Sequence, residues 1–189
     1  MLMSEPAVHK EANPGPLGLL GFGMTTVLLN LHNAGLFELN VMILAMGIAM
    51  GGLAQFIAGL MEFKGGNTFG ATAFTAYGLF WWSLVIILVN PDFLGAAGAN
   101  ALSMGFYMLL WCIFTLFMFI GTLKANRASQ VVFLTLTILF LLLAIENFTG
   151  SHAVGVIAGI EGIVCGLSAI YAAVAGVVNN EFKKTVLPV

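Results

Sequence analysis

The stretch NPGPLGLLGFGMTTVLLNLHNAGLF, residues 13–37, carries the features that decide the fold. It opens with an asparagine and two prolines, which is typical of a helix start because Asn caps a helix and Pro is favoured in its first turn. The apolar run that follows approaches the roughly 20 residues that a helix needs to cross a membrane. Near its end stand Asn30, His32 and Asn33. Three polar side chains in so apolar a segment predict that this end of it meets water or polar partners, because polar groups are costly in lipid without them.

The composition of the whole chain indicates a membrane setting. Of its 189 residues, 60% are hydrophobic and only 7% are charged, whereas soluble domains carry about 25% charged residues. So few charges cannot build a surface that faces water, and lipid is the expected solvent. The chain has no basic tract, which excludes nucleic acid as an expected partner. Cys112 and Cys165 lie in apolar runs and are expected to be buried, unreactive thiols.

Six stretches approach the length and hydropathy of spanning helices. They are residues 16–37, 39–63, 68–89, 101–123, 130–148 and 153–178. We therefore expect an all-α, polytopic membrane protein with six transmembrane helices around a narrow pore. Residues 13–179 would form the membrane domain, between an N-terminal tail of residues 1–12 and a C-terminal tail of residues 180–189.

The basic residues sort to one side of the membrane when six spans are drawn. They are Lys10, Lys64, Lys124, Arg127, Lys183 and Lys184. All of them fall in the tails or in the second and fourth connections. Basic residues collect in cytoplasmic loops, so the distribution predicts a multi-pass protein of the inner or plasma membrane with both termini in the cytoplasm.

Small residues recur at four-residue spacing in the last segment. Gly155 and Gly159 form one such pair, and Gly162 and Gly166 form another. This spacing lets helix backbones approach closely in lipid. Two uses stay open: packing within one bundle, or a contact face between protomers.

Polar residues inside the spans are the best guide to function, because each is costly away from a partner or water. The candidates for a substrate pathway are Asn30, His32 and Asn33 in the first segment, Gln55 in the second, and Thr72 and Thr75 in the third. Histidine titrates near neutral pH, so His32 is a candidate for proton coupling. Structural roles stay open as alternatives, because membrane threonines often bond to their own helix and a histidine between asparagines can form a hydrogen-bonded cluster.

Two predicted helix starts, at Asn13 and at residues 64–68, face the cytoplasm in this topology. A helix start offers free N–H groups and a partial positive charge that suit an anion such as a carboxylate. Two acidic residues need separate explanations. Glu62, close to Lys64, is expected to form an interfacial ion pair or to extend toward water. Glu161 lies inside the last segment, where a carboxylate must be neutralised, paired or hydrated.

Motifs for covalent catalysis are absent from the sequence. It contains no HExxH, GxSxG, CxxC or Walker-type phosphate loop, and its acidic residues are scattered rather than grouped for a metal. We therefore expect neither an enzyme nor a cofactor or metal site.

Several sequence blocks, in one order, resemble the acetate uptake transporter family, which includes the bacterial succinate–acetate permeases. The blocks are NPGPLGL (13–19, where the family has NPAPLGL), GFGMTTVLLNLHNAG (21–35), GGLAQFIAGLMEF (51–63), GNTFGATAFTAYGLFW (66–81), FTLFMFIGTLK (114–124), SAIY (168–171) and NEFKKTVLP (180–188). The resemblance implies a channel or proton-linked carrier for acetate and, in some members, succinate. It also implies a homohexamer with one pore in each protomer.

The resemblance further implies which residues form the pore. The family's hydrophobic constriction of Phe, Tyr and Leu maps onto Phe22, Tyr77 and Leu136, and the small residue of the SAIY block maps onto Ala169. Such a ring would pass a small acid with its proton on and would disfavour a naked carboxylate, because an ion is costly to desolvate. The Tyr77 hydroxyl would be its one polar handle.

Two rival functions stay open at this level. A narrow apolar neck with few charges suits a neutral amide such as urea nearly as well as an acid. A membrane scaffold or sensor with a vestigial pore is the second rival. Flux measurements separate the three, because the scaffold carries nothing and a urea channel is insensitive to carboxylates.

Overall fold

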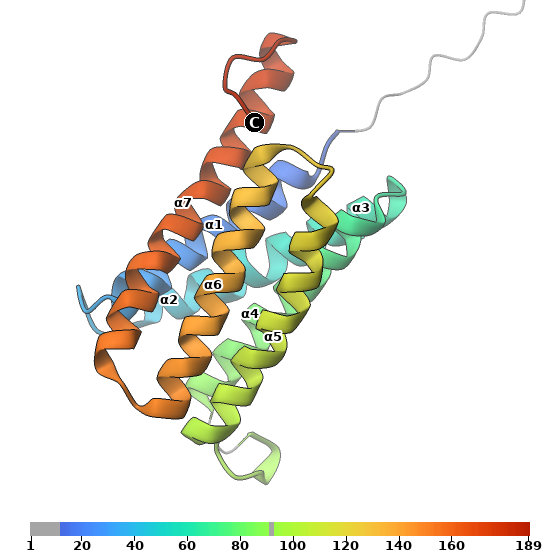
Figure 1. Ribbon diagram of the computed structural model, residues 1–189. Helices are drawn as coiled ribbons and strands as arrows, with labels where there is room; N and C mark the ends of the chain where they lie inside the picture. Colours follow the sequence, from blue (N-terminus) through green and yellow to red (C-terminus); the bar gives the residue numbers. More distant parts are fainter. Residues whose placement is uncertain (1–11, 91–92) are drawn as a thin grey trace, which may run out of the picture.

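The computed structural model describes residues 12–90 and 93–189, so the predicted N-terminal tail lies outside the described residues except for Ala12. Within these ranges the chain is helical and has no β-strand. The helices run side by side as one elongated bundle, and the last of them projects beyond the others at one end (Figure 1).

The helices follow the predicted segments closely. The first, α1, spans Gly15–Asn33. The second is continuous from Val41 to Lys64 and comprises α2 (Val41–Met46), a π-helical segment (Gly47–Ala54) and α3 (Gln55–Lys64). The remaining long helices are α4 (Thr68–Val89), α5 (Ala101–Thr122), α6 (Arg127–Thr149) and α7 (His152–Phe182). A short 3-10 turn, Phe93–Gly95, lies between α4 and α5.

Within the described residues, 5 helices are long and apolar enough to cross a membrane. They are Val41–Lys64, Thr68–Val89, Ala101–Thr122, Arg127–Thr149 and His152–Phe182. The prediction of an all-helical membrane protein is confirmed. The first predicted span is a helix but is not among the five, because glycines, one proline and polar side chains lower the hydropathy of α1.

Helix α1 lies directly against α7, and glycines make this close contact possible. A Cβ on Gly23 of α1 would stand 2.7 Å from the carbonyl oxygen of Gly166 on α7. A Cβ on Gly162 would overlap the Asn30 side chain. The glycines at four-residue spacing are buried within this one bundle, so packing inside the protomer accounts for them.

The helix starts differ in detail from the predicted ones. Helix α1 begins at Gly15, and the Asn13 side chain accepts a hydrogen bond of 2.9 Å from the Gly15 N–H. At the start of α4, Asn67 accepts from the Gly70 N–H at 3.1 Å and donates to the Glu62 carboxylate at 2.8 Å.

The expectation of an ion-paired or water-facing Glu62 was therefore wrong. Its side chain is only 6% exposed. It fits there because a Cβ on Gly70 would stand 2.8 Å from the Glu62 carboxyl carbon. The absence of a side chain at Gly70, together with the Asn67 amide, explains why the carboxylate turns into the protein.

The π-helical segment is held by side chains from its neighbours. The Trp82 indole of α4 donates to the Ile48 carbonyl at 3.0 Å, and the Thr25 hydroxyl of α1 lies 3.2 Å from the Met46 carbonyl. Wide turns of this kind occur frequently at functional sites. This one ends immediately before Gln55, whose side chain is buried in the bundle.

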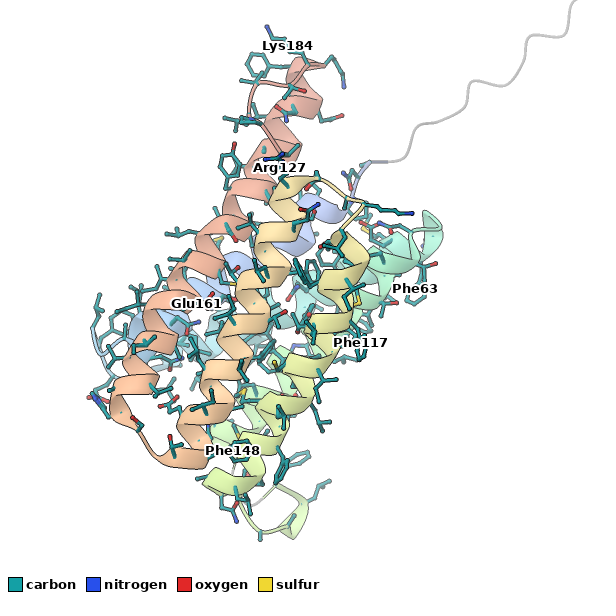
Figure 2. All side chains as sticks on the ribbon, viewed as in Figure 1. Phe63, Phe117, Arg127, Phe148, Glu161 and Lys184 are labelled. Carbon is teal, nitrogen blue, oxygen red and sulfur yellow. The ribbon has the colours of Figure 1, made fainter. Side chains whose placement is uncertain are left out.

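Two basic side chains, one at the start of α6 and one after α7, mark one end of the bundle. Arg127 and Lys184 lie toward the same end, and Phe148 lies at the opposite one (Figure 2). This arrangement agrees with the antiparallel order of helices that short connections require.

Candidate functional site

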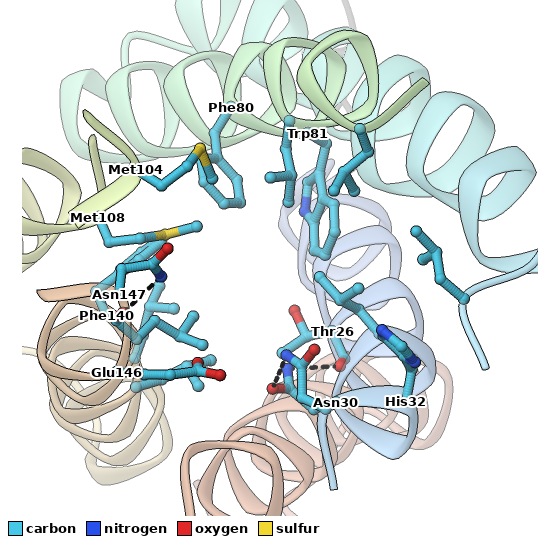
Figure 3. Close-up of a pocket in the computed structure, with 18 of the residues that line it drawn as sticks. Thr26, Asn30, His32, Phe80, Trp81, Met104, Met108, Phe140, Glu146 and Asn147 are labelled. Atoms are coloured by element: carbon cyan, nitrogen blue, oxygen red, sulfur yellow. Dashed lines mark hydrogen bonds between the residues drawn. The ribbon is translucent and has the colours of Figure 1, made fainter. Parts of the chain in front are cut away.

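An apolar cavity of about 170 Å³ lies between α1, α4, α5 and α6. Its wall is mostly leucine, methionine and aromatic side chains, and its polar members are Thr26, Asn30, His32, Asn33, Trp81, Glu146 and Asn147. Figure 3 shows the polar residues of α1 facing those of α6 across the opening. We call this space the outer cavity; it is large enough for a small organic acid with several waters, since one water needs about 10–15 Å³ on this measure.

The three predicted constriction residues lie together where the outer cavity adjoins a second, smaller pocket. Phe22 and Leu136 line both this cavity and a second pocket of about 20 Å³, and Tyr77 lines the second pocket. We call the second space the inner pocket. The rings of Phe22 and Tyr77 are 6.1 Å apart, and the three side chains are between 2% and 5% exposed. They form an apolar neck between the two spaces.

The Tyr77 hydroxyl is not free to act as the predicted polar handle. It stands 2.8 Å from the Thr115 hydroxyl of α5, and Thr115 in turn donates to the Trp111 carbonyl at 2.7 Å. Because Thr115 has given its own hydrogen to Trp111, Tyr77 is the donor in this pair. The Tyr77 ring therefore lines the neck, and the Tyr77 hydroxyl is bonded to Thr115 of α5.

Two buried polar atoms of the outer cavity have no partner among the described residues. They are the Thr26 hydroxyl and the Trp81 indole nitrogen, on side chains that are 2% and 4% exposed. In the inner pocket the Gln55 carbonyl oxygen is likewise buried and unpartnered. Buried polar groups nearly always make hydrogen bonds, so the missing partners of these three groups belong in the cavities they line.

Sequence reasoning identified Gln55 but missed Thr26 and Trp81. The available signal was helical spacing. Thr26 follows Phe22 by one turn of α1, and Trp81 follows Tyr77 by one turn of α4, so each lies on the same helix face as a neck residue. Thr and Trp are too common in membrane helices for the residue type alone to mark them.

Asn30, His32 and Asn33 line the outer cavity and also hold the end of α1. Asn30 donates to the Thr26 carbonyl at 2.9 Å and accepts from Asn33 at 3.1 Å. The His32 ring nitrogen Nδ1 stands 2.9 Å from the Phe37 carbonyl. The hydrogen-bonded cluster that was left open as the structural alternative is therefore present, on side chains that also line the outer cavity.

Glu146 and Asn147 complete the polar rim from α6. Neither residue was among those predicted to line the substrate pathway. Leu136, Leu139 and Leu143 precede Glu146 at three- and four-residue steps and line the same cavity. That spacing was the signal that would have placed Glu146 on the cavity face.

The remaining candidates lie away from both cavities. Asn13 precedes α1 and accepts a hydrogen bond from the Gly15 N–H, and Thr72 is exposed on the outside of α4. A Cβ on Gly59 would overlap the Thr75 hydroxyl, so Thr75 lies at the contact of α3 with α4. Ala169 is completely buried in the core, outside the lining of either cavity.

Glu161 is also absent from the lining of the two cavities. Both of its carboxylate oxygens are buried and lack a partner in the part of the chain that the structure describes. Its charge therefore does not stand on the wall of the candidate pathway. Across residues 12–90 and 93–189, no group of three or more His, Cys, Asp or Glu side chains is placed to hold a metal ion.

Comparison with known proteins confirms the resemblance seen in the sequence blocks. A model described as the GPR1/FUN34/yaaH family matches residues 2–189. The chain is 59% identical to the succinate-acetate/proton symporter SatP of Escherichia coli K12, over 95% of this chain and 96% of the relative. It is 34% identical to acetate permease A of Emericella nidulans, over 96% of this chain and 66% of the relative. A solved structure of the bacterial acetate channel SatP superposes with a TM-score of 0.93 at 58% identity, over 95% of this chain and 99% of that one.

Proposed function

The chain belongs to the GPR1/FUN34/yaaH family, and on that premise we propose that it transports acetate and other small carboxylates such as succinate across a membrane. Transport passes through the outer cavity and the neck of Phe22, Tyr77 and Leu136, as a channel or as a proton-linked carrier. The family and the similar proteins are transporters and channels, so we do not propose an enzymatic activity.

One observation carries this proposal: an apolar cavity that ends at an apolar neck and leaves the Thr26 hydroxyl and the Trp81 indole N–H unpartnered. A small carboxylic acid matches these features. Its oxygen accepts from the Trp81 indole, which can only donate, and its O–H or second oxygen bonds Thr26, which can do either. Its methyl group contacts the leucine and aromatic wall.

The neck and the inner pocket then select the neutral acid. Moving a naked carboxylate between Phe22 and Leu136 would strip its water without a compensating partner, which is costly in apolar surroundings. Beyond the neck, the unpartnered atom of Gln55 is a carbonyl oxygen, which can only accept. A protonated acid can donate to it, whereas a carboxylate has no hydrogen to offer.

We further propose the membrane arrangement that the sequence predicts. Helix α1 would be a sixth spanning helix, packed along α7, and the end that carries Arg127 and Lys184 would face the cytoplasm. Both termini would then be cytoplasmic, in the inner or plasma membrane, with residues 13–179 as the membrane domain and with residues 1–12 and 180–189 as tails. Helix α7 extends to Phe182, slightly beyond that boundary. A homohexamer with one pathway in each protomer is the proposed assembly.

The test is uptake of labelled acetate into proteoliposomes that contain the purified protein. Lipid-only vesicles are subtracted, because acetic acid crosses bilayers unaided. Saturable, protein-dependent uptake that succinate inhibits and urea does not would support the carboxylate function. An imposed pH gradient distinguishes a channel from a proton-linked carrier. Protein-dependent uptake of urea alone, or no flux above lipid vesicles, would contradict the proposal.

A further inference from the structure

We propose that Glu146 exchanges a proton with the carboxylate substrate in the outer cavity, so that the acid reaches the neck in its neutral form. This inference rests on the proposed transport of small carboxylic acids, and it assigns the protonation step to one residue of the same pathway.

The position of Glu146 supports this role. It lies on the α6 face that lines the outer cavity and stands ten residues beyond Leu136, which corresponds to about 15 Å along a helix. The carboxylate is therefore at the rim, between the outer solution and the apolar neck. Figure 3 shows it across the opening from Asn30 and His32.

The carboxyl group of Glu146 has no protein partner that would prevent it from exchanging a proton with a substrate. Asn30 and Asn147 use their amides on backbone carbonyls of their own helices. The Glu146 carboxyl group itself forms no hydrogen bond or ion pair with any residue that the structure describes, and only the backbone carbonyl of Glu146 accepts one, from the Gly150 N–H. Helix α7 leaves room for it, since a Cβ on Gly155 would stand 2.8 Å from the Glu146 carboxyl carbon.

Few other titratable groups face this position. His152, at the start of α7, is near enough to act electrostatically on Glu146. His32 of α1 faces the cavity, but its Nδ1 is engaged with the Phe37 carbonyl. Helices α4 and α5 contribute no acidic or basic side chain to the cavity wall. Among the described residues, Glu146 is the only carboxyl group that lines it.

The proton exchange balances without any further reactant. The O–H bond of the Glu146 carboxyl breaks, an O–H bond forms on the substrate carboxylate, and Glu146 is left as a carboxylate that the outer solution reprotonates. Burial in apolar surroundings disfavours the ionised form of a carboxyl group, and this applies both to Glu146 and to a substrate carboxylate that has entered the cavity. Inside the cavity the two groups therefore compete for one proton on similar terms. The neutral acid then moves toward Trp81, while the ionised Glu146 repels the next substrate anion until it is reprotonated.

The experiment compares the pH profile of acetate uptake by wild-type protein and by the Glu146→Gln and Glu146→Asp variants in proteoliposomes. At pH 7 nearly all acetate is ionised, and we expect Glu146→Gln to reduce uptake about a hundredfold, the lower end of the range for loss of a positioned general acid. At pH 5 the solution itself provides protonated acid, and the loss should shrink to less than about twofold. Glu146→Asp keeps the carboxyl group and should restore most of the uptake at pH 7.

Glu161→Gln serves as the matched control. It removes a carboxylate from a spanning helix outside the cavity and should keep the wild-type pH profile. Gly155→Ala would displace the Glu146 carboxylate without removing it, so it should reproduce the loss at pH 7 and provides a second route if Glu146→Gln does not fold.

The outcomes separate this inference from the proposed function. A wild-type pH profile in Glu146→Gln, or the same altered profile in Glu161→Gln, would overturn the role of Glu146 while leaving transport intact. A wild-type protein with no saturable acetate uptake would overturn the proposed function itself and this inference with it.

Discussion

The hydrogen bond between Tyr77 and Thr115 connects the neck to α5, and replacing Thr115 with Val tests it. The two hydroxyl oxygens are 2.8 Å apart, Thr115 is 0% exposed and Tyr77 is 3% exposed. Val matches the shape of Thr but cannot accept a hydrogen bond, so the Tyr77 hydroxyl would be left without its partner in an apolar core.

The size of the effect follows from this geometry. An unpartnered buried hydroxyl costs about 1–3 kcal/mol, and hydrogen bonds inside membrane bundles contribute about 0.6 kcal/mol on average and about 1.7 kcal/mol at most. We therefore expect Thr115→Val to lower the free energy of unfolding by about 1–2 kcal/mol. Tyr77→Phe should cost less, because Thr115 keeps its bond to the Trp111 carbonyl.

The assay is a double-mutant cycle read by thermal unfolding in detergent, together with acetate uptake in vesicles. A change of 1 kcal/mol shifts the melting temperature of a chain of this size by about 2–4 °C. The double variant should be less destabilised than the sum of the single variants by about 0.6–1.7 kcal/mol. Uptake by Tyr77→Phe should stay within about twofold of wild type, because a hydroxyl bonded to α5 contributes little to substrate binding.

Two results would refute this reasoning. Strictly additive destabilisation would mean that the two hydroxyls do not depend on each other. A loss of uptake greater than about tenfold in a stable Tyr77→Phe protein, which corresponds to about 1.4 kcal/mol, would mean that the hydroxyl turns toward the substrate during transport.

Four other substitutions address the cavity and the helix contacts. Trp81→Phe removes an indole N–H that has no protein partner, so the KM for acetate should rise about fivefold with little change in melting temperature; an unchanged KM would exclude that N–H from binding. Gly162→Val would push a side chain into Asn30 and should lower the free energy of unfolding by about 1–3 kcal/mol. Gly121→Ala is the control, because its Cβ would stand 3.2 Å from the Phe69 ring, which can move. It should change the free energy of unfolding by less than about 1 kcal/mol. Equal melting temperatures for Gly162→Val and Gly121→Ala would contradict the close contact of α1 with α7. Gln55→Leu removes an acceptor without a protein partner, so stability should hold or rise by about 1 kcal/mol while acetate uptake falls; full uptake would remove Gln55 from the pathway.

Much of the architecture was predictable from local patterns. Long apolar runs separated by Gly, Pro and Asn marked the helices, and the structure places their ends close to the predicted ones. Sequence blocks in one order identified the family, which the comparisons confirm. The blocks also predicted Phe22 and Leu136 as constriction residues, and in the structure both line the outer cavity and the inner pocket.

Polar residues were harder to place, because the sequence states which helix carries a side chain but does not state its neighbours. Thr72 and Thr75 share a stripe with helical spacing, yet one is exposed and the other faces Gly59. Glu62 was expected to reach water or Lys64, yet the gap left by a glycine and the amide of Asn67 turn its carboxylate into the protein.

The sequence by itself determined that lipid surrounds most of the chain, that the fold is all-helical and which family the chain belongs to. Hydropathy and ordered motifs are properties of consecutive residues, so no tertiary contact is needed to see them. Only the tertiary structure decided that Glu146 of α6 faces His32 of α1, that the Tyr77 hydroxyl is bonded to α5, and that Trp81 points unpartnered into the outer cavity. The physical reason is that the rotation of each helix about its axis is set by close packing with helices distant in sequence. A uniformly apolar helix carries little local information about which of its faces will meet them.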